Sequence, residues 1–238
     1  MNVLNADLHI HSCLSPCADR AMVPSAVIAV AAERGLDMIA ICDHNSAENA
    51  APFRRVGEAA GIVVIDGMEI TSREEVHLLA LFPDDASAAA MQDEVHAHLP
   101  GENDPEFFGE QWIVDDEDRL VGESPRLLIG ATEFTLDEIV DRVHRHGGLV
   151  IASHIERPSY SLLGQLGFVP PDLDLDGLET CADAETAGAD LPFVRSSDAH
   201  RLDEIGTGRT EFLLEEGTLA EIALALKAEG GRRIVRTR

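Results

Sequence analysis

The sequence predicts an α/β fold closed into a barrel, on three observations. Short apolar runs of strand length alternate with helical patterns along most of the chain, which is typical of β-α-β units and a largely parallel sheet. The runs number seven or eight, which suits a closed barrel better than a short open sheet. The chain also lacks the glycine-rich turn after its first strand, and the phosphate-binding loop, that mark open nucleotide-binding sheets.

Each predicted element follows from a local pattern. Strands are expected at the apolar runs over residues 2–10, 37–44, 61–70, 74–82, 149–154, 175–181, 192–200 and 210–216. Helices are expected over residues 23–36, 46–61, 85–99, 135–148, 161–167 and 218–231. Gly35 is expected to close the first helix and Ser46 to cap the second, while Thr135 and Glu138 form a capping-box pattern.

The length of 238 residues favours a single domain over residues 1–238. A chain of this size buries roughly 70% of its unfolded surface, enough for one substantial core. Residues 99–131 break the alternation of strands and helices, since they contain proline, glycine, many acids and the only tryptophan, Trp112. This segment is expected to be an irregular insertion or lid.

The charge balance restricts the partners. The chain has 44 acidic and 18 basic residues, a formal charge of −26. Long nucleic acid is disfavoured because binding its phosphates needs clustered lysine and arginine, whereas a small phosphorylated substrate stays possible. No apolar run of membrane length and no secretory signal is present, and four cysteines are too few for a disulfide framework. We therefore expect a cytoplasmic protein that does not bind membranes.

Metal-binding residue types stand at the predicted strand ends, where α/β barrels place their chemistry. His9 and His11 end the first strand, and Asp198 and His200 end a later one with the same spacing of two, which puts both side chains on one face. Other strands contribute His44, Glu69, His77 and His154. Imidazole and carboxylate together suit zinc, manganese or iron, and the set holds too few oxygens for a calcium site.

Four further histidines lie in predicted helices, and we expect them to be structural. They form two pairs spaced by two residues, His96 with His98 and His144 with His146. That spacing on a helix directs the side chains to different faces, so neither pair is suited to bind one ion.

Five groups of short motifs, in order, resemble those of the PHP superfamily, named for polymerase and histidinol phosphatase. They are DLHIH at 7–11, ICDHN at 41–45, GMEIT at 67–71 with EEVHLL at 74–79, ASH at 152–154 and SSDAH at 196–200. The resemblance implies a distorted (β/α)7 barrel and two or three divalent ions. It further implies hydrolysis of small phosphoesters, a phosphomonoester or a nucleotide, by metal-activated hydroxide that attacks phosphorus.

The resemblance also implies how the ligands are shared among the ions. The first ion would take His9, His11, Glu69 and Asp198. Glu69 would bridge to a second ion, held also by His77 and His154. A third ion would take His44 and His200.

The loop after the first motif departs from the family pattern. Relatives complete the third site with a histidine or an aspartate, whereas this chain has Cys17 at that place and Asp19 just beyond. Cys17 would be a soft ligand suited to zinc, and Asp19 is a harder alternative. A third possibility is that neither binds and that the third site is weak or empty.

Two further residues are candidates for roles around the metals. Asp7 either orients a ligand histidine from behind or is an ordinary carboxylate at a strand end. Arg157 either contacts a phosphate or is an ordinary surface arginine. Weaker candidates for contacts with the substrate are Arg73, Arg201, Asn45, Ser159, Trp112 and Tyr160.

Three other functions compete with this expectation. A nuclease or proofreading-like phosphodiesterase would use the same metal cluster, although the negative charge opposes it. Hydrolysis of amidohydrolase type is disfavoured, since many such enzymes bridge their metals with a modified lysine and the only lysine, Lys227, lies in the last predicted helix. A non-catalytic metal-binding module is the third alternative.

Overall fold

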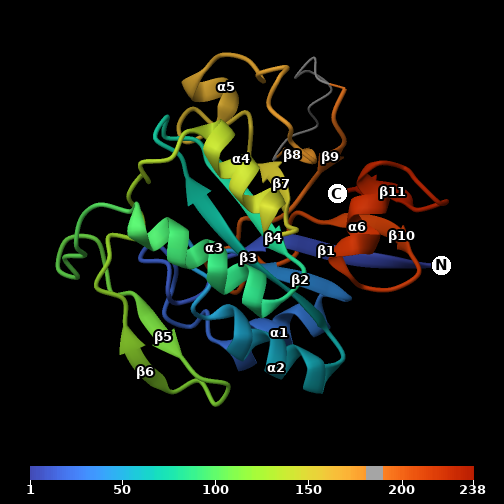
Figure 1. Ribbon diagram of the computed structural model, residues 1–238. Coiled ribbons are helices and arrows are strands. Elements are labelled where there is room, and N and C mark those ends of the chain that lie inside the picture. The colour runs from blue at the N-terminus through green and yellow to red at the C-terminus, as the bar shows by residue number, and fades with distance from the viewer. Residues whose placement is uncertain (181–189) are drawn as a thin grey trace.

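A nine-stranded sheet organises the protein in a computed structural model that describes residues 1–180 and 190–238 (Figure 1). The order of its strands is β11-β10-β1-β2-β3-β4-β7-β8-β9. Their bounds are β1 (Asn2–Ile10), β2 (Met38–Ile41), β3 (Val63–Thr71), β4 (His77–Phe82), β7 (Leu149–Ala152), β8 (Gly177–Glu179), β9 (Phe193–Val194), β10 (Thr210–Leu214) and β11 (Arg233–Thr237). Cys181, the last residue of the strand expected at 175–181, lies outside the described residues.

The sheet curls until its last segment returns to its first strand, as the predicted barrel requires. Beyond β9 the chain runs beside β1, where Ala199 pairs with Ile10 in parallel. The backbone of His11 donates to the carbonyl of Ala199 (2.9 Å), and that of Ala199 donates to the carbonyl of His9 (3.3 Å). The result is a nearly closed, distorted barrel in which residues far apart in the sequence share one rim.

The expectation of a largely parallel sheet is wrong. Strands β1, β2 and β3 run parallel, as do β7, β8 and β9, but β4 is antiparallel to both β3 and β7. The reason is the connection between β3 and β4, since a short turn over residues 72–76 can only reverse the chain, whereas a parallel strand needs a long crossover. β10 also lies antiparallel beside β1 and β11 antiparallel beside β10, and β11 follows the predicted last helix, where no strand was expected.

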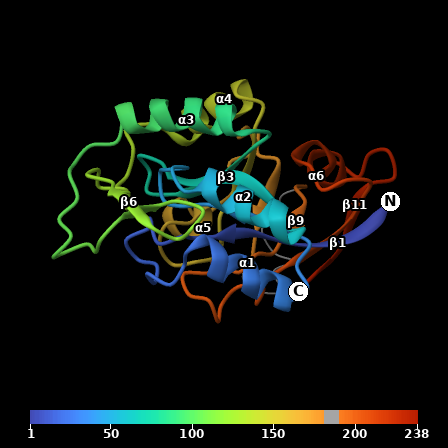
Figure 2. The same ribbon diagram turned by 90° about the horizontal axis from the view of Figure 1, so that it is seen from below.

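Two pairs of helices cover the barrel on different sides. Helices α1 (Pro24–Glu33) and α2 (Ala50–Ala60) pack with the outer residues of β1 and β2. Helices α3 (Asp85–Ala97) and α4 (Leu136–Arg145) lie next to each other over β3, β4 and β7 (Figure 2). Glu94 of α3 links the two helices through ion pairs with Arg142 of α4 and with His146 at its end. The shorter helices are α5 (Leu162–Gln165) and α6 (Leu219–Leu226).

Two predictions for the helix ends are confirmed and one is wrong. Gly35, just past the end of α1, has a positive φ of 67°. Thr135 and Glu138 form the predicted capping box of α4. The prediction of Ser46 as the cap of α2 is wrong, because α2 begins at Ala50 after Asn49 and the Ser46 hydroxyl accepts from the backbone of Glu48 in the preceding turn.

The segment 99–131 contains a two-stranded sheet of β5 (Trp112–Val114) and β6 (Leu120–Glu123), which projects from the barrel in Figure 1. Two buried asparagines tie this insertion to the rim. Asn49 donates to the carbonyl of Trp112 (3.0 Å) and accepts from the backbone of Val114 (3.0 Å). Asn45 donates to the carbonyls of Leu128 (2.7 Å) and Gly130 (2.8 Å). The insertion is therefore fixed next to the loops that carry the predicted ligands.

Apolar side chains fill the barrel below the rim. Residues from opposite strands, such as Leu8, Leu81, Ile151 and Phe212, are buried in one cluster that α6 extends. In the described part of the chain, no helix is long and apolar enough to cross a membrane.

Candidate metal centre

All eight histidine and carboxylate ligands implied by the resemblance meet at one rim of the barrel. Seven lie in or after the carboxyl ends of β1, β2, β3, β7 and the segment that follows β9. His77 is the exception, because it begins β4 and reaches the same rim through the antiparallel turn that pairs it with Thr71. Seven of the eight are buried, and His200 is partly exposed.

Glu69 lies at the centre of this cluster. Its Oε1 is 3.0 Å from Nδ1 of His77, 3.2 Å from Nε2 of His154 and 3.4 Å from Nε2 of His9. Its Oε2 is 3.1 Å from Nδ1 of His44. One carboxylate therefore faces imidazoles from four different segments, as a ligand shared between two ions must.

Asp198 is the second carboxylate that several side chains contact. Its Oδ1 lies 3.1 Å from Nε2 of His11 and 3.2 Å from Nε2 of His9, and these two nitrogens are 3.1 Å apart. Its Oδ2 is 2.5 Å from Nη1 of Arg157. Asp198 thus presents one oxygen to the histidines and the other to an arginine.

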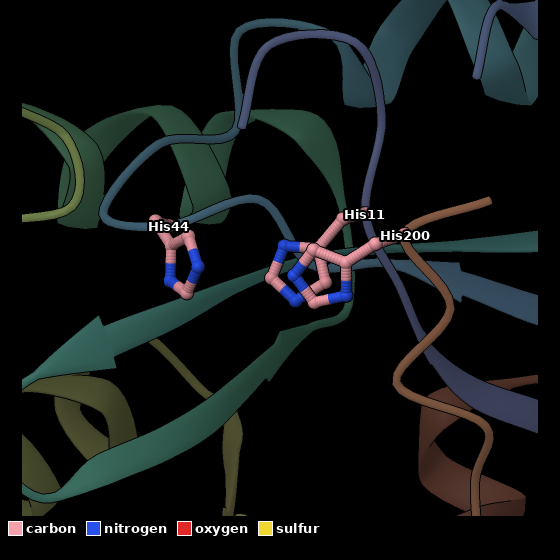
Figure 3. Close-up of side chains that lie close together, drawn as sticks. All are labelled: His11, His44 and His200. Carbon is pink, nitrogen blue, oxygen red and sulfur yellow. The ribbon is translucent and has the colours of Figure 1, made fainter. Parts of the chain in front are cut away.

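Three sets of side chains bring one ligand atom each to within 4.8 Å of one another. They are His9, His11 and Asp198; His44, Glu69 and His77; and His11, His44 and His200. Figure 3 shows the third set, in which the rings of His11 and His200 stack with their centroids 4.1 Å apart.

The donor atoms fit a divalent metal. Nδ1 of His44 and Nδ1 of His77 are buried close to Glu69, yet neither makes a hydrogen bond of acceptable geometry. Buried polar atoms are rarely left without a partner, and nitrogens that converge on a carboxylate without bonding to it are arranged as metal ligands are. The mixture of imidazole and carboxylate suits zinc, manganese or iron.

Electrostatics keeps the two carboxylates ionised. Burial alone would raise the pKa of Glu69, but the imidazoles of His77 and His9 lower this pKa well below its usual range. Burial opposes ionisation of Asp198 in the same way, and His9 and His11 lower its pKa. Burial and the neighbouring His200 lower the pKa of His11 well below its ordinary value, which favours the neutral ring.

The loop between β1 and α1 places Cys17 and Asp19 differently. Desolvation would raise the pKa of the Cys17 thiol, but hydrogen bonds with His200 and His44 lower it to about 6. Asp19 is exposed, and its Oδ1 accepts from the backbone of Ala21 (2.8 Å). Cys17 therefore contacts two members of the third set, whereas the Asp19 carboxylate caps its own turn.

Asp7 is fully buried beneath the loop that carries Asp198 and His200. Its oxygens accept from the backbone (2.9 Å) and hydroxyl (2.6 Å) of Ser197 and from the backbone of Gly206 (2.7 Å). Burial raises the pKa of Asp7 to about 6 against these hydrogen bonds. The structure thus places Asp7 where it holds the ligand-bearing loop.

Two buried carboxylates behind the ligands were not predicted. Oε2 of Glu179 lies 3.0 Å from Nδ1 of His9 and accepts a hydrogen bond from the backbone N–H of His154 (3.0 Å). Asp43 accepts from Ser12 and Ser15, and the Ser15 hydroxyl lies 2.9 Å from Nδ1 of His11. The position of Asp43 directly before His44 was the only local signal, and no local pattern marks Glu179.

A small pocket of about 180 Å³ opens onto the cluster. Beside six of the ligands, its walls are Ile129 of the insertion, Arg157 and Tyr160. The Tyr160 ring stacks on His77 with centroids 4.8 Å apart. The other predicted contacts lie elsewhere: Arg20 covers the ring of Trp112, Asn45 is occupied with the insertion, and Arg201 pairs with Asp203.

Strained backbone accompanies the ligands. His154 and Asp198 have positive φ angles of 28° and 51°, and Tyr160 at the pocket mouth has 56°. Such conformations cost of order 1–3 kcal/mol each and persist only where the surroundings enforce them, which is common at functional sites.

The four histidines expected to be structural lie outside the three sets. His98 contacts the carbonyl of Glu94, His144 pairs with Asp176 and His146 pairs with Glu94. His96 is partly buried on α3, and burial lowers its pKa to about 4.

Comparison with known proteins agrees with the family resemblance seen in the sequence. Residues 7–162 match the PHP domain and residues 185–229 the PHP-associated family. An uncharacterized protein, MJ1587, of Methanocaldococcus jannaschii is 26% identical over 74% of this chain and 80% of its own length. Phosphoribosyl 1,2-cyclic phosphate 1,2-diphosphodiesterase of Eggerthella lenta is 30% identical over 35% of this chain and 32% of its own.

Among solved structures, the chain is similar to PfuEndoQ, a lesion-specific endonuclease from Pyrococcus furiosus. The TM-score is 0.76 at 21% identity, over 99% of this chain. The chain spans only 58% of that protein, so this similarity shows the fold alone. Together with the match over residues 7–162, the barrel and its ligand-lined rim show that the chain belongs to the PHP family of metal-dependent phosphoesterases and nucleases.

Proposed function

We propose that the protein hydrolyses small phosphoesters, a phosphomonoester or a nucleotide, with two or three divalent metal ions. The observation that carries this proposal is the convergence of six imidazoles and two ionised carboxylates on one rim, where all but His154 form three overlapping sets and His154 lies beside Glu69. His11 and His44 each belong to two of the sets, so the sets lie close enough together to hold neighbouring ions. Zinc, manganese and iron are the candidates, because the donors are mainly nitrogen.

Ions bound in this way would lower the pKa of water and neutralise the charge of phosphoryl oxygens. The protein's own side chains would do the remaining work. Glu69 and Asp198 hold the histidines in register, and Arg157 presents a guanidinium at the pocket for a phosphate oxygen. Ile129 and Tyr160 narrow the opening and restrict the access of bulk water.

Two features support a small substrate. The pocket of about 180 Å³ has room for a phosphoryl group and a modest part of its leaving group. The formal charge of −26 repels a polyanion, whereas Arg157 and bound cations act locally on one phosphate.

A substrate screen tests this proposal. The protein is stripped with a chelator and reloaded separately with zinc, manganese and iron. Hydrolysis is then measured on mononucleotides, p-nitrophenyl phosphate and small cyclic phosphodiesters. We expect metal-dependent release of phosphate or alcohol from a small substrate, and loss of this activity in His154→Ala. His96→Ala is the matched control, because it removes a partly buried histidine of α3 that is not one of the eight predicted ligands.

A nuclease is the second candidate, favoured by the similarity of fold to a lesion-specific endonuclease. The same metal-loaded protein is therefore offered single-stranded and lesion-containing duplex oligonucleotides. A clear preference for an oligonucleotide over every small phosphoester would replace the first proposal with this one. Absence of hydrolysis on both panels, with metals bound, would exclude both.

A further inference from the structure

The buried hydroxyl of Ser15 has every hydrogen-bonding position occupied. It donates its proton to Oδ1 of Asp43 at 2.6 Å. It accepts from the backbone N–H of His44 at 3.2 Å and lies 2.9 Å from Nδ1 of His11. A hydroxyl has one proton to donate and two lone pairs to accept with. Since the proton goes to Asp43, the contact with His11 requires the ring to be the donor.

Asp43 is arranged to accept the Ser15 proton. Its Oδ1 also accepts a hydrogen bond from the backbone N–H of Ser12 (2.8 Å), and its Oδ2 accepts one from the Ser12 hydroxyl (2.6 Å). The Ser12 hydroxyl in turn accepts from Asn49 (2.9 Å) and from the backbone of Leu14 (3.2 Å), so its own proton also points to Asp43. Three donated hydrogen bonds favour the charged carboxylate, which can only accept.

We infer that Ser15, held by Asp43, is a positioning residue that fixes the tautomer of His11. The contact with Ser15 places an N–H on Nδ1. Nε2 is then the ring nitrogen available to an ion, and it lies 3.1 Å from Oδ1 of Asp198 and 3.1 Å from Nε2 of His9. His11 belongs to two of the three sets, so the state of Nε2 affects both.

The arrangement has a parallel on the neighbouring ligand. Nδ1 of His9 faces Glu179, which likewise leaves Nε2 directed at the cluster. The ring of His9 contacts a carboxylate directly, whereas the ring of His11 contacts a serine that is itself hydrogen-bonded to a carboxylate. This inference deepens the proposed function and rests on the metal site, but its central claim concerns a proton that is present without metal.

Nuclear magnetic resonance of the ¹⁵N-histidine-labelled, chelator-treated protein tests that claim directly. Long-range proton-nitrogen correlations distinguish a protonated ring nitrogen from an unprotonated one, and the spectrum of His11→Gln identifies the His11 signals. We expect Nδ1 of His11 to be protonated in the wild type. An unprotonated Nδ1 in the wild-type spectrum overturns the inference, whether or not any variant folds.

Variants of Ser15 provide the second readout. In Ser15→Ala we expect a mixture of His11 tautomers and a loss of zinc affinity of roughly 10–100-fold, the range typical of residues that orient a ligand. Ser15→Thr keeps the hydroxyl and is expected to restore both. Ser72→Ala is the control, because Ser72 is buried and accepts only from the backbone of Glu74 and Val76. Wild-type zinc affinity and an unchanged His11 spectrum in folded Ser15→Ala would contradict the inference.

The two proposals fail in different ways. If Nδ1 of His11 is protonated but no phosphoester is hydrolysed, the proposed function fails and the role of Ser15 stands. If hydrolysis is found but the His11 proton is on Nε2, the role of Ser15 is wrong and the proposed function is unaffected.

Discussion

Nδ1 of His9 lies 3.0 Å from Oε2 of Glu179, although 170 positions separate the two residues in the chain. Both side chains are buried, at 0% and 1% exposure. Glu179 also accepts the backbone N–H of His154, so one carboxylate fixes ligands from β1 and from the end of β7. This contact is possible only because the sheet curls and brings β8 across the barrel from β1.

Substitution of Glu179 by glutamine is expected to weaken metal binding by roughly 10–100-fold, because an amide holds the His9 ring less firmly and lowers its basicity. Competition with a chromogenic chelator measures this affinity. Glu94→Gln is the matched control, since Glu94 pairs with Arg142 and His146 away from the rim and should not affect metal affinity. Equal metal affinity in Glu179→Gln and the wild type would contradict a role for Glu179 in holding the ligands.

Arg157→Ala is expected to raise KM for a small phosphoester roughly tenfold, which corresponds to about 1.4 kcal/mol, while the protein retains its metal. The reason is that Arg157 lines the pocket and touches Asp198 only through Oδ2, the oxygen turned away from the histidines. Steady-state kinetics and elemental analysis of the same samples separate the two effects. Arg201→Ala, which removes an exposed arginine paired with Asp203, serves as the comparison. An unchanged KM, or metal loss equal to that of a ligand variant, would argue against contact with the phosphate.

Asn45→Ala is expected to lower the free energy of unfolding by roughly 2–4 kcal/mol. Two carbonyls of the insertion would lose their donor, and alanine tolerates the positive φ of 49° less well than asparagine. Urea unfolding measures the loss. Asn45→Gly tolerates the backbone conformation but also lacks the amide, so it should be nearly as unstable if the hydrogen bonds dominate. If Asn45→Gly matches the wild type, the anchor contributes little.

The stability of the protein should depend on pH through His144, which lies far from the rim. The hydrogen bond that the His144 ring donates to the Asp176 carboxylate raises the pKa of His144 above its ordinary value of 6.5. The folded state therefore binds this proton more tightly than the unfolded chain. The resulting stabilisation is fully present below pH 6.5 and is lost as the pH rises through the raised pKa. His144→Gln should flatten this part of the curve in urea unfolding at pH values from 6 to 9, and an unaltered slope would show that the pair is not coupled to folding.

The sequence was sufficient to predict which candidate ligands meet at the rim, but not which residues support them. His9, Glu69 and Asp198 could be identified because they stand at strand ends in short motifs, and the rim of a barrel brings strand ends together. Glu179 could not, because its contact with His9 depends on how far the sheet curls, which no local pattern specifies. Similarly, the partner of Arg157 became visible only when the segment after β9 returned to β1.

The errors in the fold have equally specific causes. The antiparallel direction of β4 follows from the short turn after β3, and its apolar run does not reveal direction. Strand β11 was missed because its apolar content is only the adjacent pair Ile234 and Val235, just after a predicted helix end. The segment 99–131 was expected to be irregular, but it contains the hairpin of β5 and β6, whose strands are too short to show a clear alternation.

Activity measured as a function of added metal tests the central claim most directly. The chelator-treated wild type should show no phosphoester hydrolysis and should recover it as zinc, manganese or iron is restored, up to two or three ions per chain. His154→Ala should bind less metal and stay inactive under the same titration, whereas His96→Ala should follow the wild type. Full hydrolysis by the chelated wild type, or full metal content and rate in His154→Ala, would contradict the assignment of this rim as a catalytic metal centre.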